Sequence, residues 1–270
     1  MRWAVYDLRL CPPSFDFIAF LVLAKYHGAE AILFIPGICE RKLGQYTEAQ
    51  QRERMKTILF PACDLYGMKW IYASPSEAME ADIAWPPFYR TGRWPNGYTM
   101  GWLKSIKKPE PFMPSQQALE RARKALGDRT IVVHMRTMDY QYKRNSSPDW
   151  RRWARDRNAY VLSDDPISLD DRLGFMEAAK LNIGVSAGPM SLCHLSQRPY
   201  VVIKYAAGES SSDEAFFKAQ GWKPGEQYPW ANKQQLVVWN DSDSYEAIEA
   251  AYSKWLANNP KELACTTAPQ

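Results

Sequence analysis

The sequence lacks the features of membrane-spanning and secreted chains. Its longest apolar run, residues 17–24, covers about two helical turns, whereas a helix needs roughly 20 residues to span a bilayer. The chain opens with Met1-Arg2-Trp3 and an immediate strand pattern rather than a basic segment and a cleavable apolar stretch. Its five cysteines lie far apart, are odd in number and form no C-x-x-C pair, which favours reduced thiols. We therefore expect a cytoplasmic protein without a transmembrane segment.

Several ligand-binding motifs are absent too. No G-x-G-x-x-G follows the first expected strand and no G-x-x-x-x-G-K-[ST] occurs anywhere, which argues against dinucleotide dehydrogenases and P-loop proteins. The three histidines are scattered and the cysteines isolated, so no transition-metal cluster is expected. Asp241-Ser-Asp could chelate a divalent cation, but it precedes an expected helix start at Ser244 and indicates turn and capping chemistry. We expect no metal site.

The composition is that of a soluble globular protein. The 270 residues are 46% hydrophobic and 24% charged, and this length suits two domains of about 100 to 150 residues. Thirty-four basic and thirty acidic residues leave a net charge of +4. This mild excess suits an anionic small ligand or a nucleic-acid surface without requiring either.

Strand and helix patterns alternate in the first half of the chain. Residues 3–10, 31–36 and 69–73 are short and rich in β-branched or aromatic side chains, whereas residues 15–27 and 47–66 have helical periodicity. This β-α-β-α-β order predicts a parallel sheet with right-handed crossovers.

The alternation restarts in the second half. The expected elements are helix 115–126, strand 130–135, helix 149–156, strand 159–163, helix 169–180, strand 181–185, helix 189–196, strand 200–204, strand 235–239 and helix 244–257. We therefore predict an α/β protein of two Rossmann-like doubly wound domains that face a cleft, residues 1–114 and 115–270.

Residues 85–114 separate the two sets and hold six prolines, three glycines and several aromatics. This composition is too aromatic for a disordered linker and too interrupted for a long element. We expect an ordered connector that packs on the domain cleft; a simple surface loop at the junction is the alternative.

A candidate phosphate cradle follows the expected strand 181–185. Small residues form a turn, and a helix is expected to open at Pro189 or Met190. A small turn lets the backbone approach a ligand closely, proline pre-sets the first helical φ, and free N–H groups at a helix start attract anions. Many helix starts without a ligand share these features. The candidate donor-binding residues here are Ser186, Gly188, Pro189, Met190 and Ser191.

Further candidates follow other strands of the second half, because ligands of open α/β sheets bind at the carboxyl ends of the strands. Arg136 comes directly after an apolar strand and could hold a phosphate through a charge-assisted, fork-shaped contact. Arg144 and Asn145 lie in a loop that could reach the same place. Asp164 follows strand 159–163, where a carboxylate can bind ribose hydroxyls or cap a helix.

Two residues are candidate general bases. Asp16 stands near the start of an apolar helix, where it is either a base or a favourable first-turn charge beside a capping serine. His134 could accept a proton at neutral pH, although a lone histidine on a strand is more often a core residue. Asp7 lies inside the first strand and would need a buried partner such as Arg9 or Arg41.

Two segments resemble parts of the two-domain GT-B glycosyltransferases. Val132-Val-His-Met-Arg-Thr-Met-Asp is similar to the His-x-Arg-x-x-Asp segment of fucosyltransferase-like enzymes, in which the arginine holds the pyrophosphate of the donor. Ala179-Lys-Leu-Asn-Ile-Gly-Val-Ser-Ala-Gly-Pro-Met-Ser-Leu is similar to the heptosyltransferase segment whose turn and helix start meet the nucleotide diphosphate. The resemblance covers about a quarter of the chain. The first half matches only in the alternating order of its strands and helices, and no acceptor motif is found.

The resemblance implies a metal-independent glycosyltransferase with a nucleotide-sugar as co-substrate and no resident cofactor. Arg136, Arg144 and the turn at Gly188 would stabilise the leaving diphosphate. Inverting transfer would need a base on the acceptor hydroxyl, with Asp16 the first candidate and His134 the second, whereas retaining transfer would not. The acceptor would be a glycan, a small molecule or a modified DNA base.

Three other functions stay open at this point. One is a glycosyltransferase of hydroxylated DNA bases, with which the Arg/Trp-rich residues 90–102 and 150–157 are compatible. Another is a sugar-nucleotide epimerase or hydrolase, which would turn over the donor without an acceptor. The last is a non-catalytic nucleotide-binding protein.

Overall fold

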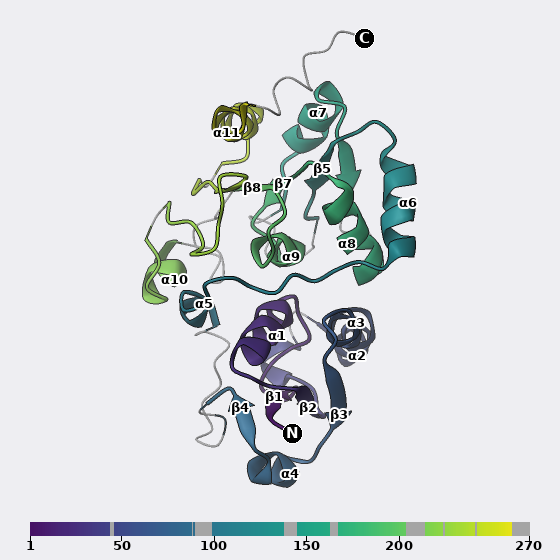
Figure 1. Ribbon diagram of the computed structural model, residues 1–270, viewed down its shortest axis with the longest axis vertical. Coiled ribbons are helices and arrows are strands. Elements are labelled where there is room, and N and C mark those ends of the chain that lie inside the picture. Colours follow the sequence, from purple (N-terminus) through teal and green to yellow (C-terminus); the bar gives the residue numbers. More distant parts are fainter. Residues whose placement is uncertain are drawn as a thin grey trace. The chain divides into compact units, whose positions relative to one another are not determined.

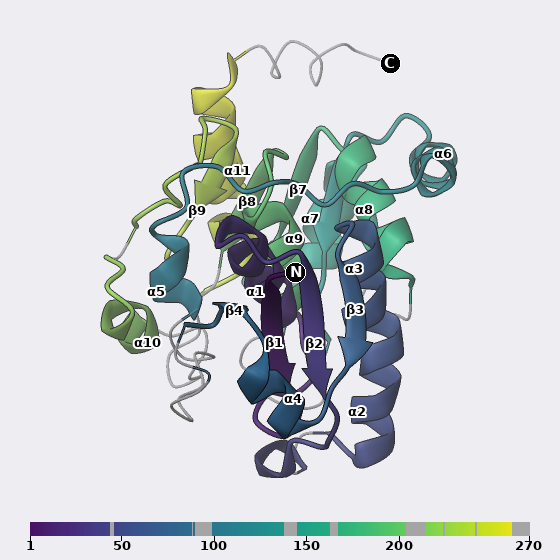
Figure 2. The same ribbon diagram turned by 60° about the horizontal axis from the view of Figure 1, so that its bottom comes forward.

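The computed structural model describes residues 1–43, 46–87, 89, 99–137, 145–162, 167–203, 214–223, 225–240 and 242–260. The chain divides into two compact units (Figures 1 and 2). Unit 1 consists of Met1–Met113 with Ser168–Asp170, and unit 2 of Pro114–Ile167 with Asp171–Gln270. Each unit contains one sheet in which all described strand pairs are parallel. The predicted α/β class is confirmed.

The sheet of unit 1 has the strand order β3-β2-β1-β4. Its strands are β1 (Trp3–Asp7), β2 (Ala31–Ile35), β3 (Lys69–Tyr72) and β4 (Ile83–Trp85). Every residue of β2 is buried, as expected for an apolar strand with neighbours on both sides. The short strand β4 was not predicted, because three residues are too few to show a periodicity.

Local signals explain where the helices of unit 1 begin. Thr47 and Gln50 form a reciprocal capping box at one helix start, and Ser74 and Glu77 form a second. The predicted helix 47–66 is broken by one π-helical segment, which the periodicity did not reveal. The described helices are α1 (Asp16–Tyr26), η1 (Glu40–Lys42), α2 (Glu48–Arg54), η2 (Met55–Leu59), α3 (Phe60–Leu65), α4 (Pro75–Glu80) and α5 (Thr99–Leu103).

The end of the predicted connector packs on unit 1. The Tyr66 ring stacks on Phe112 with ring centroids 4.2 Å apart, and the Tyr66 hydroxyl donates to Glu110 O at 3.2 Å. Lys25 Nζ lies 2.9 Å from Glu110 Oε1. Residues 110–112 are therefore ordered parts of this unit, while a placement of the connector on a cleft stays a prediction.

The sheet of unit 2 has the strand order β6-β5-β7-β8-β9. Strand β5 pairs with β7 so that His134 lies opposite Gly184. A Cβ on Gly184 would come within 2.6 Å of His134 O, so only glycine allows the two central strands to pair this closely. The strands are β5 (Ile131–His134), β6 (Tyr160–Leu162), β7 (Leu181–Val185), β8 (Tyr200–Ile203) and β9 (Gln235–Val237).

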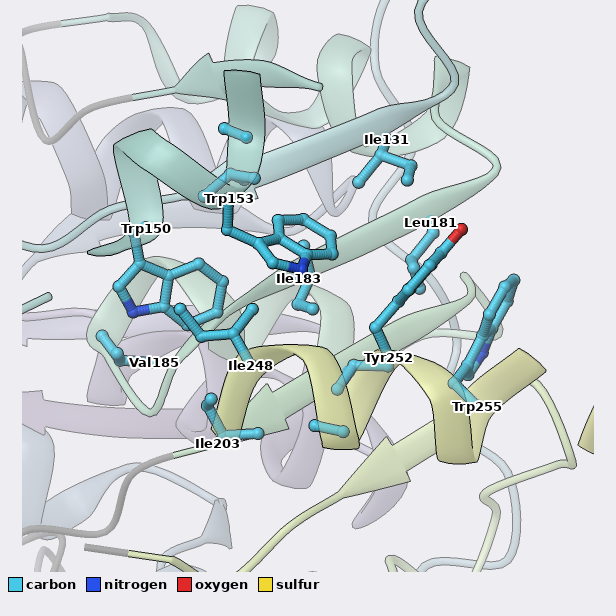
Figure 3. Packing of buried hydrophobic residues seen from close by; sticks show 14 of the residues in the cluster. Ile131, Trp150, Trp153, Leu181, Ile183, Val185, Ile203, Ile248, Tyr252 and Trp255 are labelled. Atoms are coloured by element: carbon cyan, nitrogen blue, oxygen red, sulfur yellow. The ribbon is translucent and has the colours of Figure 1, made fainter. Parts of the chain in front are cut away.

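Helices cover both faces of this sheet. The indole rings of Trp150 and Trp153 on α7 (Asp149–Asp156) pack with Ile248, Tyr252 and Trp255 of α11 (Tyr245–Asn258) against one face (Figure 3). Leu126 of α6 (Gln116–Leu126) and Phe175 of α8 (Leu169–Ala178) pack with Val132 on the other face. The remaining described helices are η5 (Gly188–Met190), α9 (Ser191–His194) and α10 (Glu214–Ala219).

Candidate functional site

The carboxyl edge of the unit 2 sheet brings together two predicted parts of the donor site. Strands β5 and β7 are neighbours, and their register continued by two residues places Arg136 level with Ser186. Both segments stay attached to the sheet beyond the strand ends, because Met135 N donates to Leu162 O at 3.0 Å and Ser186 N to Ile203 O at 2.9 Å. Neighbouring strands lie about 4.8 Å apart. The two strand ends thus form one local surface.

Arg136 is held in place by the residues that close the loop after β5. Its backbone N donates to Ser146 Oγ at 2.9 Å, and Ser146 N donates back to Arg136 O at 2.9 Å. Its Nη1 donates to Asn145 Oδ1 at 2.5 Å, and the residue is 5% exposed. The predicted neighbours Arg136 and Asn145 are therefore in contact. Arg144 and Asp164 lie outside the described residues.

The turn after β7 is tighter than the predicted helix start. In place of one helix over 189–196, the chain forms the 3-10 turn η5 and the four-residue helix α9. Ser191 Oγ donates to Gly188 O at 2.5 Å, and Met190 N donates to Ala187 O at 3.0 Å. The Met190 side chain is buried, whereas Ser186, Gly188 and Pro189 are partly exposed. Met190 therefore supports the turn from within, and the partly exposed residues face outward.

His134 is a core residue of β5. Only 3% of it is exposed, and its Nε2 is 2.9 Å from Asn182 Oδ1 on the neighbouring strand. Asn182 Nδ2 donates in turn to Met176 O at 3.0 Å, which fixes the amide orientation. Burial lowers the pKa of His134 to about 4, against the smaller opposing effect of the bond with Asn182. This position favours the core interpretation of His134 over its role as a base.

Asp16 is the first residue of α1 in unit 1, and it is exposed. Ser14 Oγ donates to Asp16 Oδ2 at 3.2 Å and also accepts from Asp16 N at 3.3 Å. Ser14 is therefore not the predicted N-cap, because that position is held by Phe15 without a side-chain cap bond, although the serine hydroxyl does bond the N–H of the first helical residue. The carboxylate is still accessible to solvent, so its role as a base stays a prediction.

A second polar cluster lies at the carboxyl end of β1. The carboxylate of Asp7 is fully buried and accepts from Arg9 Nε at 2.9 Å and from Arg9 Nη2 at 2.7 Å, which confirms Arg9 as its expected partner. Tyr89 OH donates to Asp7 Oδ2 at 3.2 Å. Burial, together with the nearby carboxylate, raises the pKa of Tyr89 to about 12. Sequence patterns missed Tyr89 because it stands 82 residues from Asp7.

The segment before α7 is bonded by a distant aspartate, although the helix itself has Pro148 as its N-cap and no side-chain cap bond. Asp243 Oδ2 accepts from Ser147 N at 2.7 Å and from Trp150 Nε1 at 2.8 Å. In return, Asp149 Oδ2 accepts from Tyr245 N at the start of α11 at 3.0 Å. Each aspartate therefore bonds a backbone N–H next to the start of the other helix, while α11 is capped by its own Ser244, whose hydroxyl accepts from Ala247 N at 3.3 Å. Asp243 thus has a structural role in the turn before α11, and the predicted capping at this helix start comes from Ser244; Asp241 lies outside the described residues.

Neither a family model nor a curated protein matches the sequence. A similar solved structure is the crystal structure of the glycosyl transferase family 9 from Veillonella parvula DSM 2008. Its sequence is 13% identical, the TM-score is 0.49, and the superposed region covers 95% of this chain and 97% of that one. At this identity and TM-score the likeness carries no argument about activity, so a function has to be inferred from the residues of this chain.

Proposed function

We propose that the protein is a glycosyltransferase that moves a sugar from a nucleoside-diphosphate donor to an acceptor hydroxyl without a metal ion. The observation that carries this proposal is the adjacency of strands β5 and β7, whose carboxyl ends lead directly to Arg136 and to the turn at Ser186. Ligands of open α/β sheets bind at this edge, where backbone N–H groups and an arginine can share a phosphate. GT-B enzymes, which the sequence resembles here, bind the donor diphosphate at the corresponding place.

Arg136 would supply the positive charge for the leaving diphosphate. Its guanidinium is largely shielded from water, and a charge-assisted hydrogen bond is stronger in such a position than at an open surface. A diphosphate would replace part of the present contact between Arg136 Nη1 and Asn145 Oδ1. The proposed diphosphate site also includes Arg144 and the turn residues Gly188 and Ser191. The proposed contact with the ribose is made by Asp164.

Asp16 is the proposed base if the transfer inverts the sugar carbon. Its carboxylate is exposed and bonded only weakly, at 3.2 Å, by the Ser14 hydroxyl. It can therefore accept a proton without the cost of breaking a buried contact. If the transfer is retaining, no base is needed and Asp16→Ala would leave the rate nearly unchanged.

Thermal-shift measurements with nucleoside diphosphates and their sugars test the proposal. A ligand that binds only the folded state raises the apparent stability. Arg136→Ala should then lose about 2 kcal/mol of diphosphate stabilisation, or about thirtyfold in kcat/KM once an acceptor is found. Arg151→Ala, which removes an exposed arginine on α7, is the matched control. The proposal fails if no nucleoside diphosphate shifts the melting curve, or if both variants respond alike.

The nucleic-acid alternative loses part of its support. Trp150 and Trp153 are fully buried, and their indole N–H groups donate to Asp243 and Glu249. Residues 150–157 thus offer no tryptophan face on which bases could stack.

An epimerase or hydrolase would consume the donor without an acceptor, and a binding protein would not release sugar at all. One turnover assay, run with and without an acceptor, distinguishes both from a transferase.

The proposal includes a cytoplasmic setting. Cys11, Cys39, Cys63 and Cys193 are all buried as free thiols. This arrangement suits a reducing compartment. Within the described parts of the chain, no helix has both the length and the apolar character needed to cross a membrane.

A further inference from the structure

Unit 1 contains a cavity of about 370 Å³ at the carboxyl edge of its own sheet. Strands β2 and β3 end there, and η2 and the end of α2 form the facing wall. Small-molecule pockets typically measure about 300 to 1,000 Å³, so this volume suits a small ligand. The lining residues are Pro36, Gly37, Ile38, Arg52, Met55 and Tyr72.

The wall after β2 is fixed at two points, by the buried side chain of Gln51 and by the contact of Gly37 with Arg9. The side chain of Gln51, which is almost fully buried, accepts from Cys39 N at 3.0 Å and donates to Cys39 O at 3.3 Å. Gly37 lies against Arg9 so closely that a Cβ would come within 2.3 Å of Arg9 Cγ. Arg9 cannot retreat without breaking its two side-chain bonds to buried Asp7. The cavity is therefore formed before any ligand arrives.

The lining has one charge and several apolar surfaces. Of the six described lining residues, only Arg52 is charged, and its Nη2 lies 3.7 Å from Glu48 Oε2 one turn earlier. Both side chains of this pair are more than half exposed, and such exposed pairs on helices contribute only about 0.3 to 0.5 kcal/mol. An anion can therefore displace Glu48 at little cost. Ile38 and Met55 offer aliphatic contact, and the ring of Tyr72 is half exposed.

We propose that this cavity binds a small anion with an apolar body, such as an aromatic or aliphatic phosphate or carboxylate. Arg52 would hold the anionic group through its planar fork, and Ile38, Met55 and Tyr72 would pack on the apolar body. The site lies wholly within unit 1, and the inference does not depend on the proposed transferase activity.

Three probes separate the ionic contact from the apolar contact: phenyl phosphate, inorganic phosphate and phenol. Binding is followed by the amide NMR shifts of Gly37 and Ile38, which report on this cavity. We expect phenyl phosphate to bind at least about tenfold more tightly than either fragment, because it combines an ionic contact with apolar burial. Equal binding of inorganic phosphate or of phenol would overturn the proposal.

Variants then assign the contacts. Arg52→Leu should weaken phenyl phosphate about tenfold or more, whereas Lys56→Leu, which removes an exposed cation that does not line the cavity, should leave it unchanged. Tyr72→Ala should weaken phenyl phosphate but not inorganic phosphate. Arg136→Ala should have no effect, which separates this site from the proposed donor site. Full binding by Arg52→Leu, or an equal loss in Lys56→Leu, would refute the assignment.

Discussion

Replacement of Asp243 by alanine should destabilise unit 2 more than any ordinary surface substitution. The carboxylate accepts two short hydrogen bonds, from Ser147 N at 2.7 Å and Trp150 Nε1 at 2.8 Å, and Asp243 is 5% exposed. Alanine leaves both donors without this acceptor, and the Trp150 indole is fully buried. The substitution also removes the link between Asp243, before α11, and the backbone of Ser147, before α7.

The magnitude follows from these contacts. A hydrogen bond to a charged group contributes about 1.5 to 3 kcal/mol, and its loss at a buried donor costs the desolvation of that donor as well. Two such bonds give an expected loss of about 3 to 5 kcal/mol in the free energy of unfolding, a large share of the stability of an ordinary domain. Asp243→Asn keeps one carbonyl acceptor and should lose about 1 to 2 kcal/mol.

Urea unfolding followed by circular dichroism and tryptophan fluorescence measures the effect, with the two units fitted as separate transitions. Ser242→Ala is the matched control, because Ser242 is an exposed neighbour that lies in the same turn. A second comparison uses Asp149→Ala, which removes the opposite hydrogen bond to Tyr245 N. Since both carboxylates join the same two helix starts, the double variant should lose less than the sum of the single losses. An Asp243→Ala protein as stable as Ser242→Ala would refute the stabilising role of these hydrogen bonds.

Two further predictions concern the central strands of unit 2. Gly184→Ala should destabilise this unit by about 2 to 3 kcal/mol in urea unfolding, because the added methyl meets the backbone of His134 at 2.6 Å. Gly127→Ala in the same unit, with open space but a positive φ, should lose only about 1 kcal/mol, and equal losses would contradict the packing argument. The pKa of His134 is lowered from 6.5 to about 4, so the folded state favours the neutral imidazole. The contribution of His134 to the free energy of unfolding is therefore complete above pH 6.5, and about 3 kcal/mol of it is lost as the pH falls toward 4. His134→Gln should remove this part of the pH dependence, and parallel pH profiles of the two proteins would contradict it.

The sequence was sufficient to predict the α/β class and most of the elements. Helix 149–156 and strand 181–185 have the predicted bounds, because apolar periodicity and flanking turn residues mark both clearly. Strand β4, helix α4 and helix α10 were missed, since each has six residues or fewer and too little pattern to distinguish it from a loop.

The candidate site was harder to predict, because its details depend on contacts between distant residues. Position after a strand identified Arg136, and a charge inside a strand identified Asp7, but neither showed that Asn145 bonds the first or that Tyr89 bonds the second. Nor does the sequence near α7 show that Ser147 N is bonded by Asp243, an aspartate 96 residues later. Local rules describe which groups need a partner, whereas the fold decides which partner they receive.

The packing of α7 against α11 has a consequence for the order in which the chain is made. Unit 1 completes its sheet once β4 has left the ribosome, early in translation. Trp150 and Trp153 are made near the middle, yet the side chains that cover them belong to α11, near the end of the chain. We therefore expect nascent chains arrested before residue 243 to show a protease-resistant first half and to recruit chaperones through the exposed tryptophans of the second.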